Sequence, residues 1–420
     1  MPMRLSKFPK LSLVLYFYLW PLLMEARLLT LDEATQRALT YSPAVAIVDT
    51  TWKVRQAEEY QANFLPNPVV SVEIDKANLI GKEKKRAGDR GFSCNLSQAI
   101  ELGGKRHLRK QTAGLQTSLA FKEIEVIKLE ASCQVEKAFI EVAAAQEYLR
   151  FAQELQLSAQ EVLLSTSAKI EGGKISSLEG KKAKLSVLTA HLALEKARNN
   201  FENSKKKLAL IWGDSHPDFT SVDYNLLEIT LVEDLAAFIA EQNDNIATKQ
   251  WELQIANADL MIASEKAQRI PNLVVTAGYI NSAEDGEGLL LGFSMAIPIW
   301  DRNQGNISKA KHLLNQLYNK RNKDNLQARL QLEAEYAQLL TSYQEGLLYK
   351  NDVLPVAVAT FEGAKQEYLQ GKSDYLELLD AQRTLFDVHD KYMHALVDYH
   401  QRKVELNRLV RVGYANTQGP

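Results

Sequence analysis

Apolar and polar positions alternate along the chain with two different periods. Between residues 374 and 411, apolar residues return in steps of three and four, and only Arg402 interrupts this heptad pattern. The heptad pattern predicts a long helix that packs as a coiled coil. Four shorter stretches instead alternate every second residue, which is typical of half-buried strands. These stretches are residues 68–76, 91–99, 272–281 and 289–298.

Long stretches without helix breakers separate the predicted strands. Residues 31–63 are helical in composition and are interrupted at Pro43, and residues 104–170 contain no proline. Residues 303–370 contain only Pro355, where we expect a kink because proline lacks an N–H group. At ~1.5 Å per residue, each of the two longer helices would extend on the order of 100 Å. The chain is therefore predicted to be mainly α-helical with a small β part.

The sequence contains two copies of one unit. "LPNPVVSVEI" (65–74) resembles "IPNLVVTAGYI" (270–280), and "AKIEGGKISSLEG" (168–180) resembles "EYLQGKSDYLELL" (367–379). Both pairs are separated by about 200 residues and occur in the same order, which indicates an internal duplication. We assign repeat 1 to residues 27–227, repeat 2 to residues 228–413, and a C-terminal tail to residues 414–420. Each repeat contains two strands and a helical hairpin, with tips near Gly172 and Gly371.

The N-terminus has the pattern of an export signal. Basic residues precede an apolar run at residues 11–24, which at about 14 residues is short for a bilayer span of ~20. A signal peptide over residues 1–26 is predicted, and an uncleaved membrane anchor is the alternative. No cysteine follows the run, so lipid attachment at this point is not indicated.

Overall charge and cysteine content exclude several kinds of protein. The formal net charge is −2, which argues against a nucleic-acid partner. The two cysteines, Cys94 and Cys133, form neither a disulfide framework nor a thiolate metal site. No nucleophile, cofactor motif or metal-ligand cluster indicates an enzyme.

Four strands are too few to close a barrel by themselves. Unpaired strand edges are very unfavourable in lipid, so bilayer-crossing strands must belong to a closed sheet. Three copies of the chain would supply twelve strands, a reasonable barrel with an open lumen. The sequence therefore predicts a trimer, and the alternative is a structural coiled-coil protein with ordinary β-hairpins.

Four segments of the chain resemble a known family, the TolC-type outer membrane efflux factors. They are "LPNPVVS" (65–71), "IELGGKR" (100–106), "PIWDRNQG" (298–305) and "YLQGKSDYLELLDAQ" (368–382), and the resemblance extends over residues 30–411. "DRNQG" and "GKSDYLELLDAQR" are similar to the heavy-metal (cobalt–zinc–cadmium) branch of the family.

The resemblance implies both an architecture and a set of partners. It implies a homotrimer whose twelve-stranded barrel crosses the outer membrane of a Gram-negative bacterium and continues as a long α-helical barrel in the periplasm. It also implies docking to a periplasmic adaptor protein and to an inner-membrane RND-type pump. The expected function is passive export of heavy-metal cations, without a cofactor.

Two carboxylates are candidate residues of the pore entrance. Glu377 and Asp380 are three residues apart and therefore share one face of the helix that follows the second tip. The resemblance matches them to the acidic positions that surround the periplasmic entrance of the tunnel. Three chains would bring six carboxylates to one constriction, which would favour cations. An ordinary solvated helix face is the alternative.

The two tips are candidate contacts for the adaptor. Glycine permits the positive φ that a turn between antiparallel helices requires. The resemblance adds that the tip surfaces contact the adaptor protein. The candidate residues are Gly172, Gly173, Lys174, Gly371 and Lys372.

Two further motifs have plain structural interpretations. Asp301 and Asn303 in "DRNQG" are interpreted as caps of the following helix rather than as part of a phosphate loop. Asp390, His394 and Asp398 recur every four residues, and a solvated helix face is favoured over a metal site.

Two other functions stay open at this stage. A channel of the same fold could serve drug export or type I protein secretion. A protein of a different class, the periplasmic adaptor, also contains a helical hairpin, but it is expected to have one hairpin and a lipoyl-like domain.

Overall fold

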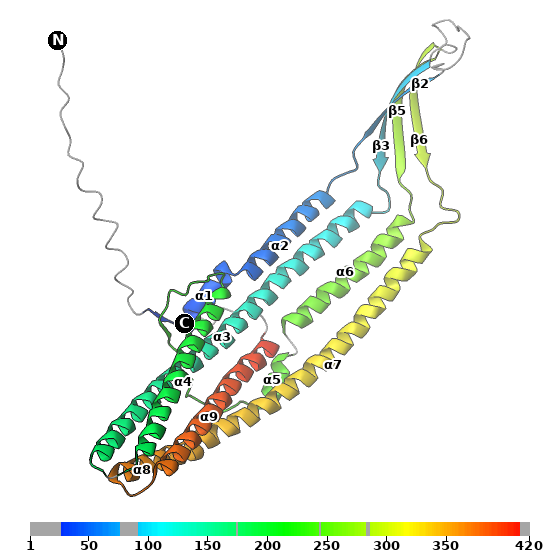
Figure 1. The fold of residues 1–420 in the computed structure, drawn as a ribbon. Helices are drawn as coiled ribbons and strands as arrows, with labels where there is room; N and C mark the ends of the chain where they lie inside the picture. Colours follow the sequence, from blue (N-terminus) through cyan, green and yellow to red (C-terminus); the bar gives the residue numbers. More distant parts are fainter. Residues whose placement is uncertain (1–26, 76–90, 174, 243–244, 283–285, 412–420) are drawn as a thin grey trace, which may run out of the picture. The chain divides into compact units, whose positions relative to one another are not determined.

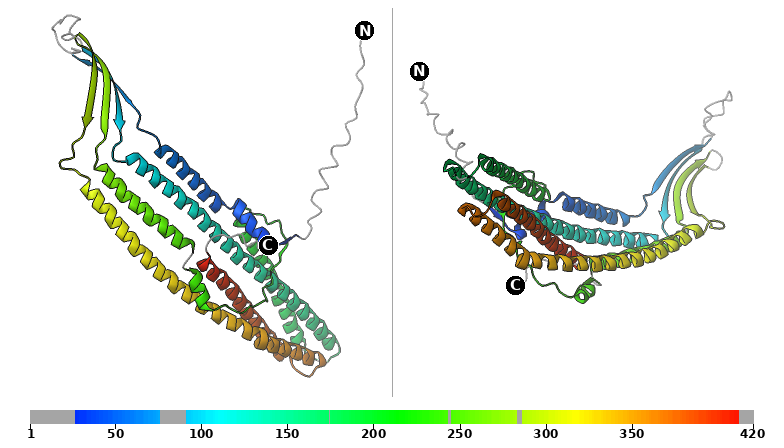
Figure 2. Two further views of the ribbon diagram at one scale, coloured as in Figure 1. Left: turned by 180° about the vertical axis from the view of Figure 1, so that it is seen from behind. Right: turned by 60° about the horizontal axis from the view of Figure 1, so that its bottom comes forward.

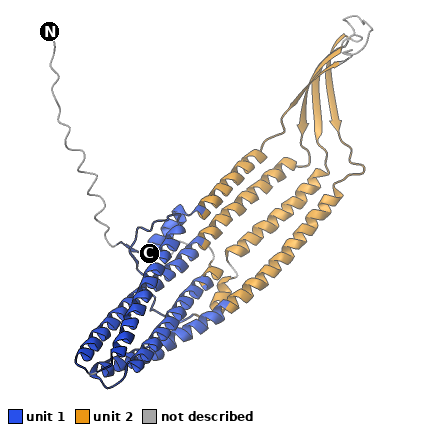
Figure 3. Cartoon of the chain, viewed as in Figure 1, with its two compact units in different colours: residues 1–43, 131–232, 335–406 blue, residues 44–130, 233–334, 407–420 orange. Residues whose placement is uncertain are grey.

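The computed structural model describes residues 27–75, 91–173, 175–242, 245–282 and 286–411. The predicted signal peptide (1–26), Lys174 and the tail 414–420 lie outside these residues. The chain forms two compact units, each of which draws on both predicted repeats (Figure 3). Unit 1 comprises residues 1–43, 131–232 and 335–406, and unit 2 comprises residues 44–130, 233–334 and 407–420.

Long helices form most of both units (Figure 1). The first repeat contains α1 (Leu31–Tyr41), α2 (Pro43–Ala62), α3 (Lys105–Glu171) and α4 (Ser177–Leu210). The second repeat contains α5 (Leu235–Gln242), α6 (Ile246–Gln268), α7 (Gln304–Leu348), α8 (Leu354–Gln370) and α9 (Tyr375–Val410).

The expected irregularity near Pro355 takes the form of a π-helical turn. The turn η1 (Tyr349–Val353) joins α7 to α8, and Pro355 occupies the first turn of α8. A proline cannot donate a backbone hydrogen bond, and its ring clashes with the carbonyl four residues earlier. The wider turn directly before Pro355 accommodates both effects, so the helical path continues through the proline.

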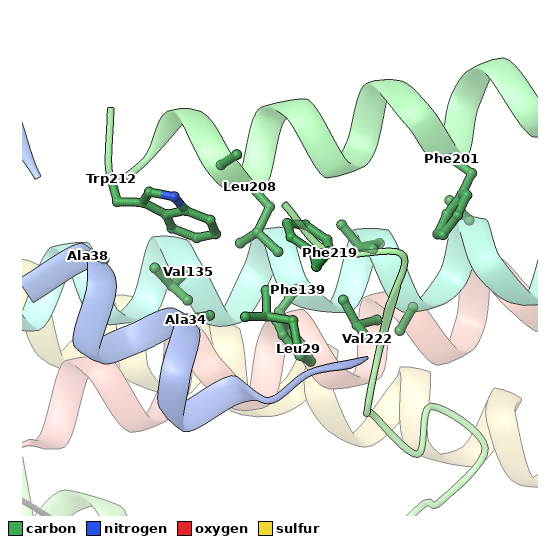
Figure 4. Packing of buried hydrophobic residues seen from close by; sticks show 14 residues of the cluster. Leu29, Ala34, Ala38, Val135, Phe139, Phe201, Leu208, Trp212, Phe219 and Val222 are labelled. Atoms are coloured by element: carbon green, nitrogen blue, oxygen red, sulfur yellow. The ribbon is translucent and has the colours of Figure 1, made fainter. Parts of the chain in front are cut away.

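In the core of unit 1, residues 29–38 pack against the middle of α3 and the end of α4. The short strand β1 (Leu28–Leu29) pairs in parallel with β4 (Ser221–Val222). Ala34 and Ala38 lie one turn apart on α1, and both are fully buried. Figure 4 shows Phe139, Leu208, Trp212 and Phe219 packed around these small residues. The alanines permit α1 to approach closely, because they have no side chain beyond Cβ.

The helices of unit 1 also enclose a second buried cluster beside the two tips. The end of α3, the start of α4, α8 and the first turns of α9 all contribute to it. The heptad positions Leu378, Ala381, Leu385 and Tyr392 are buried, at 3%, 7%, 5% and 4% exposure. The heptad pattern therefore identified the buried face of α9 correctly.

Unit 2 carries the β-sheet, whose strands continue beyond the ends of its helices (Figure 1, Figure 2). The strands β2 (Val69–Asp75), β3 (Gly91–Ile100), β5 (Leu273–Ser282) and β6 (Gly286–Met295) form one antiparallel sheet in the order β2-β3-β5-β6. The first three agree closely with the expected ranges. The fourth begins three residues earlier than residue 289, because Ser282 already pairs with Gly286 and the connection between β5 and β6 is short.

Candidate functional site

The second tip is a tight turn built by one glycine. Gly371 has φ +77° and ψ +22°, the left-handed conformation that glycine adopts without a steric penalty. Its N–H group donates to the carbonyl of Tyr368 at 3.0 Å, and the N–H of Lys372 donates to the carbonyl of Glu367 at 2.8 Å. This pair of hydrogen bonds is a Schellman motif, which terminates α8.

A carboxylate that sequence reasoning missed starts the next helix. Asp374 Oδ1 accepts hydrogen bonds from the N–H groups of Leu376 at 2.8 Å and Glu377 at 3.1 Å. Asp374 is therefore the N-cap of α9 and satisfies two of the free donors at the helix start. The signal was present in the sequence, since an aspartate followed by a glutamate three residues later is typical of a helix N-terminus.

Glu377 and Asp380 lie on the exposed face of the first turns of α9. Tyr375 and Leu378, on the opposite face, are both 3% exposed. Within the described part of the chain, no hydrogen bond or ion pair engages either carboxylate side chain. The structure thus places the two candidate carboxylates together, next to the turn and available to an external partner or to ions.

Two tyrosines anchor this tip to the end of the first hairpin. The rings of Tyr368 and Tyr375 meet edge to face with centroids 5.7 Å apart. The Tyr368 hydroxyl lies 2.8 Å from the hydroxyl of buried Thr166, and Lys169 Nζ lies 4.6 Å above the Tyr368 ring. Burial raises the pKa of both tyrosines, so their hydroxyls stay neutral hydrogen-bonding groups. The two tips are therefore held side by side by α3 and α8.

The first tip also has a glycine with positive φ followed by a side-chain cap of the next helix, but the capping residue differs. Gly173 has φ +69°, and its N–H group donates to the carbonyl of Ile170 at 2.9 Å. Ser176, at the position equivalent to Asp374, caps α4 by accepting from the N–H of Leu178 at 3.2 Å. Gly172 completes the turn, whereas the predicted contact Lys174 lies outside the described residues.

The sheet of unit 2 has one apolar and one mostly small or polar face. Directly paired residues of antiparallel strands point to the same side of a sheet. The register places Val72 beside Cys94, Tyr279 and Leu289, and this apolar side is widely exposed. Its exposed large side chains include Val70 (64%), Val72 (58%), Ile74 (62%), Leu96 (51%), Leu289 (88%), Leu291 (78%) and Phe293 (75%).

The opposite face of the sheet suits contact with water. Ser97, Thr276 and Gly292 lie in one row on this face, and the Ser97 and Thr276 hydroxyls are 2.9 Å apart. Asn95 faces Gly278, where an added Cβ would lie only 2.0 Å from the Asn95 side chain. An apolar outer face with a polar inner face is the pattern of a transmembrane barrel strand.

The "DRNQG" motif acts as a structural turn. Asp301 Oδ1 accepts from the N–H of Asn303 at 2.9 Å, which closes a turn directly before α7 begins at Gln304 rather than capping an N–H group of the helix itself. Asn303 itself has a positive φ of 58°, which is unusual for a residue other than glycine. Its side-chain amide donates to the Glu265 carbonyl at 2.8 Å and carboxylate at 2.6 Å, which ties the start of α7 to α6.

The structure does not assemble a metal site from Asp390, His394 and Asp398. His394 Nε2 is 3.8 Å from Asp390 Oδ2, and Asp390 already accepts from the Tyr148 hydroxyl at 2.7 Å. Across the described residues, no group of three potential ligands could hold a metal ion. In the same part of the chain, no helix has the length and apolar character of a membrane span.

These features define a class: an outer membrane channel whose helical hairpins extend into the periplasm. The family model described as "Outer membrane efflux protein" matches residues 36–214 and 238–410. The chain belongs to this family, the TolC-like channels, which form trimers in tripartite efflux pumps. It is a transport protein without enzymatic activity.

Individual relatives agree with the assignment. The cobalt-zinc-cadmium resistance protein CzcC of Cupriavidus metallidurans is 27% identical over 393 residues, which cover 93% of this chain and 90% of CzcC. The crystal structure of CusC superimposes with a TM-score of 0.75 at 15% identity, over 91% of this chain and 92% of CusC. The Campylobacter jejuni channel CmeC superimposes with a TM-score of 0.73 at 16% identity, over 93% and 87% of the two chains.

Proposed function

We propose that this channel is the exit duct for heavy-metal cations in a tripartite pump with an RND-type inner-membrane component. The observation that carries the substrate assignment is the similarity to CzcC along nearly the whole chain. The exposed, unpaired carboxylates Glu377 and Asp380 are consistent with a cationic cargo, because a ring of acidic groups at a constriction favours cations.

In this proposal, three chains bring their second tips together around the periplasmic entrance. Glu377 and Asp380 then form a ring of six carboxylates. Gly172, Gly173, Lys174, Gly371 and Lys372 form the end surface that contacts the periplasmic adaptor. Backbone hydrogen bonds hold Gly172, Gly173, Gly371 and Lys372 in their turns, so the adaptor meets a preformed shape at these residues.

The metal tolerance of cells tests whether the exported substrate is a heavy-metal cation. A strain that lacks the gene should become sensitive to zinc, cobalt or cadmium, and the intact gene should restore tolerance. Restored tolerance to organic drugs with unchanged metal sensitivity would contradict the metal assignment and favour drug export by the same fold.

Ion selectivity of the purified channel in planar bilayers tests the entrance. The double variant Glu377→Gln/Asp380→Asn should show a lower preference for cations and weaker block by divalent cations. The matched control Glu362→Gln/Asp398→Asn removes two exposed carboxylates from α8 and α9 away from the tip and should leave selectivity unchanged. Equal selectivity in the wild type, the double variant and the control would contradict the pore-entrance assignment. Glu377 and Asp380 would then be ordinary solvent-exposed residues of α9.

A further inference from the structure

Three basic side chains surround a surface pocket at the junction of helices and sheet in unit 2. The pocket has a volume of about 440 Å³ and is lined by Lys266, Arg269, Ile270, Pro298 and Arg302. Lys266 and Arg269 belong to the last turn and C-cap of α6, whereas Arg302 follows β6. Segments more than 30 residues apart thus bring three positive charges to one concavity.

The three cations of this pocket have no anionic partner among the described side chains. Among the described residues, the guanidinium of Arg302 donates a hydrogen bond only to the backbone carbonyl of Ile299, at 3.2 Å from Nε. The nearby carboxylates of Glu265 and Asp301 accept hydrogen bonds from Asn303 and do not line the pocket. The bonds from Asn303 to Glu265 place Arg302 near α6, and because no acidic side chain lines the pocket, its lining carries a net positive charge.

The same junction exposes large apolar side chains. Ile297, Ile299 and Trp300 are 76%, 54% and 85% exposed, and they directly follow β6. In the sequence they follow Met295, the last residue of β6, which is 53% exposed. Tryptophan prefers the boundary between acyl chains and headgroups, and the charged ends of lysine and arginine reach toward headgroups from such a boundary.

We propose that Lys266, Arg269 and Arg302 bind the phosphate of an anionic phospholipid headgroup at the periplasmic boundary of the outer membrane. In an outer membrane channel with periplasmic helices, this junction is where the bilayer ends. Trp300 and Ile299 enter the acyl layer beside the bound lipid, and the two arginines can each donate two parallel hydrogen bonds to phosphate oxygens. The site fixes the depth of the sheet in the membrane.

Lipid retention measured by mass spectrometry tests the pocket. The purified full-length protein, in a mixture of phosphatidylglycerol and phosphatidylcholine, should retain phosphatidylglycerol in preference. The variant Lys266→Gln/Arg269→Gln/Arg302→Gln should lose this preference, by roughly fivefold for each charge removed. The control Lys184→Gln/Lys206→Gln/Lys323→Gln removes three exposed cations elsewhere and should retain it. Equal loss in both variants would overturn the proposal.

Competition separates a lipid site from a site for free anions. Inorganic phosphate at millimolar concentration should leave phosphatidylglycerol bound, because the apolar contacts of Trp300 and Ile299 act only on the lipid. Displacement by inorganic phosphate alone would assign the pocket to a soluble anion instead.

Fluorescence of Trp300 provides a test that does not depend on the basic variant. The difference in emission between the wild type and Trp300→Phe isolates this residue among the five tryptophans of the chain. Phosphatidylglycerol brominated near the headgroup end of its acyl chains should quench this difference signal strongly, and aqueous acrylamide weakly. Strong acrylamide quenching without quenching by the brominated lipid would contradict the membrane position of Trp300.

Discussion

At the scale of single residues, the backbone conformation of one glycine closes each of the two tips. Gly173 and Gly371 both have positive φ, and a Cβ atom added to either one would meet nothing within 4 Å. A substitution there is therefore opposed by backbone strain alone, of about 1–2 kcal/mol for a non-glycine residue. The open surroundings explain how the turns can present their outer surfaces to a partner.

Opposite effects are expected for two glycines in or next to α8. Gly371→Ala should lower stability by about 1 kcal/mol because φ is +77°. Gly363→Ala should raise stability by about 0.5–1 kcal/mol, because Gly363 is helical and faces open space. Thermal unfolding of the detergent-purified protein, followed by circular dichroism, measures both changes.

Gly371→Val should additionally weaken adaptor binding while the amount of channel in the outer membrane stays unchanged. A collapse of that amount would argue for a role of Gly371 in folding only.

A histidine that sequence reasoning did not single out packs between α3 and α9 in unit 1. The imidazole of His389 stacks on Phe151 with ring centroids 3.6 Å apart, and its Nδ1 has no hydrogen-bond partner among the described residues. Burial, followed by the charge of Arg150, lowers the pKa of His389 to about 4, against the opposing effects of Glu147 and Asp390. The ring is therefore neutral in the folded protein at pH 7.

Acidification should destabilise the packing of α3 against α9. Between pH 6.5 and about 4 the unfolded chain binds a proton at His389 that the folded chain does not, so stability falls as pH falls. A loss of about 1–2 kcal/mol is expected after allowance for partial exposure of the ring. The variant His389→Phe keeps the aromatic stacking and should flatten the pH dependence of the unfolding temperature, whereas exposed His312→Gln should not. Identical pH profiles in wild type and His389→Phe would contradict this role.

At the scale of elements, short polar connections determine how helices begin and where they meet the sheet. Asn303 links the start of α7 to Glu265 of α6, and Lys105 Nζ at the start of α3 contacts Asn272 Oδ1 before β5 at 2.6 Å. The repeated Pro-Asn motif therefore serves at least once to join a helix start to a strand start. Glycine is favoured at position 103 in the same junction, because φ is +74° and an added Cβ would lie 3.2 Å from the Ala267 carbonyl.

Two substitutions of Asn303 should separate the contribution of its hydrogen bonds to Glu265 from that of its positive φ. Asn303→Gly keeps the positive φ but loses the bonds to Glu265, at an expected cost of about 1.5–3 kcal/mol for hydrogen bonds to a charged group. Asn303→Ala should cost about 1 kcal/mol more, because alanine is strained in this backbone conformation. Chemical denaturation of the purified protein gives both values. An alanine variant as stable as the glycine variant would show that backbone strain contributes little.

At the scale of the whole molecule, the sheet cannot be complete in a single chain. The strand order leaves β2 and β6 at the edges, each with one side unpaired in the described chain. Unpaired backbone groups and the exposed apolar face would be strongly unfavourable in lipid and in water, respectively. Association through the edges pairs these backbone groups, in agreement with the trimers formed by TolC-like channels, and contact with acyl chains covers the apolar face.

Assembly of the purified protein is therefore expected to involve three copies. Light scattering combined with size-exclusion chromatography, corrected for bound detergent, should give three times the mass of one chain. The same particles should conduct ions after reconstitution in planar bilayers. Conducting particles with the mass of a monomer would refute closure by three copies.

Local sequence patterns determined much of the architecture. The heptad of residues 374–411 identified the buried face of α9, because burial on a helix follows directly from a period near 3.6 residues. The alternation at Val70, Val72 and Ile74 likewise located β2 and its apolar face, because strand side chains alternate between the two faces. The repeated glycine tips were visible because few other residues adopt positive φ.

Contacts between distant segments were decided only by the tertiary structure. The π-helical turn before Pro355, the link from Asn303 to Glu265, and the stacking of His389 on Phe151 each join groups whose proximity no local period encodes. The basic pocket of Lys266, Arg269 and Arg302 arises in the same way, because its members become neighbours only when the end of α6 meets the start of α7. Periodicity along a chain determines which face of an element is buried, whereas packing between elements determines which side chains meet.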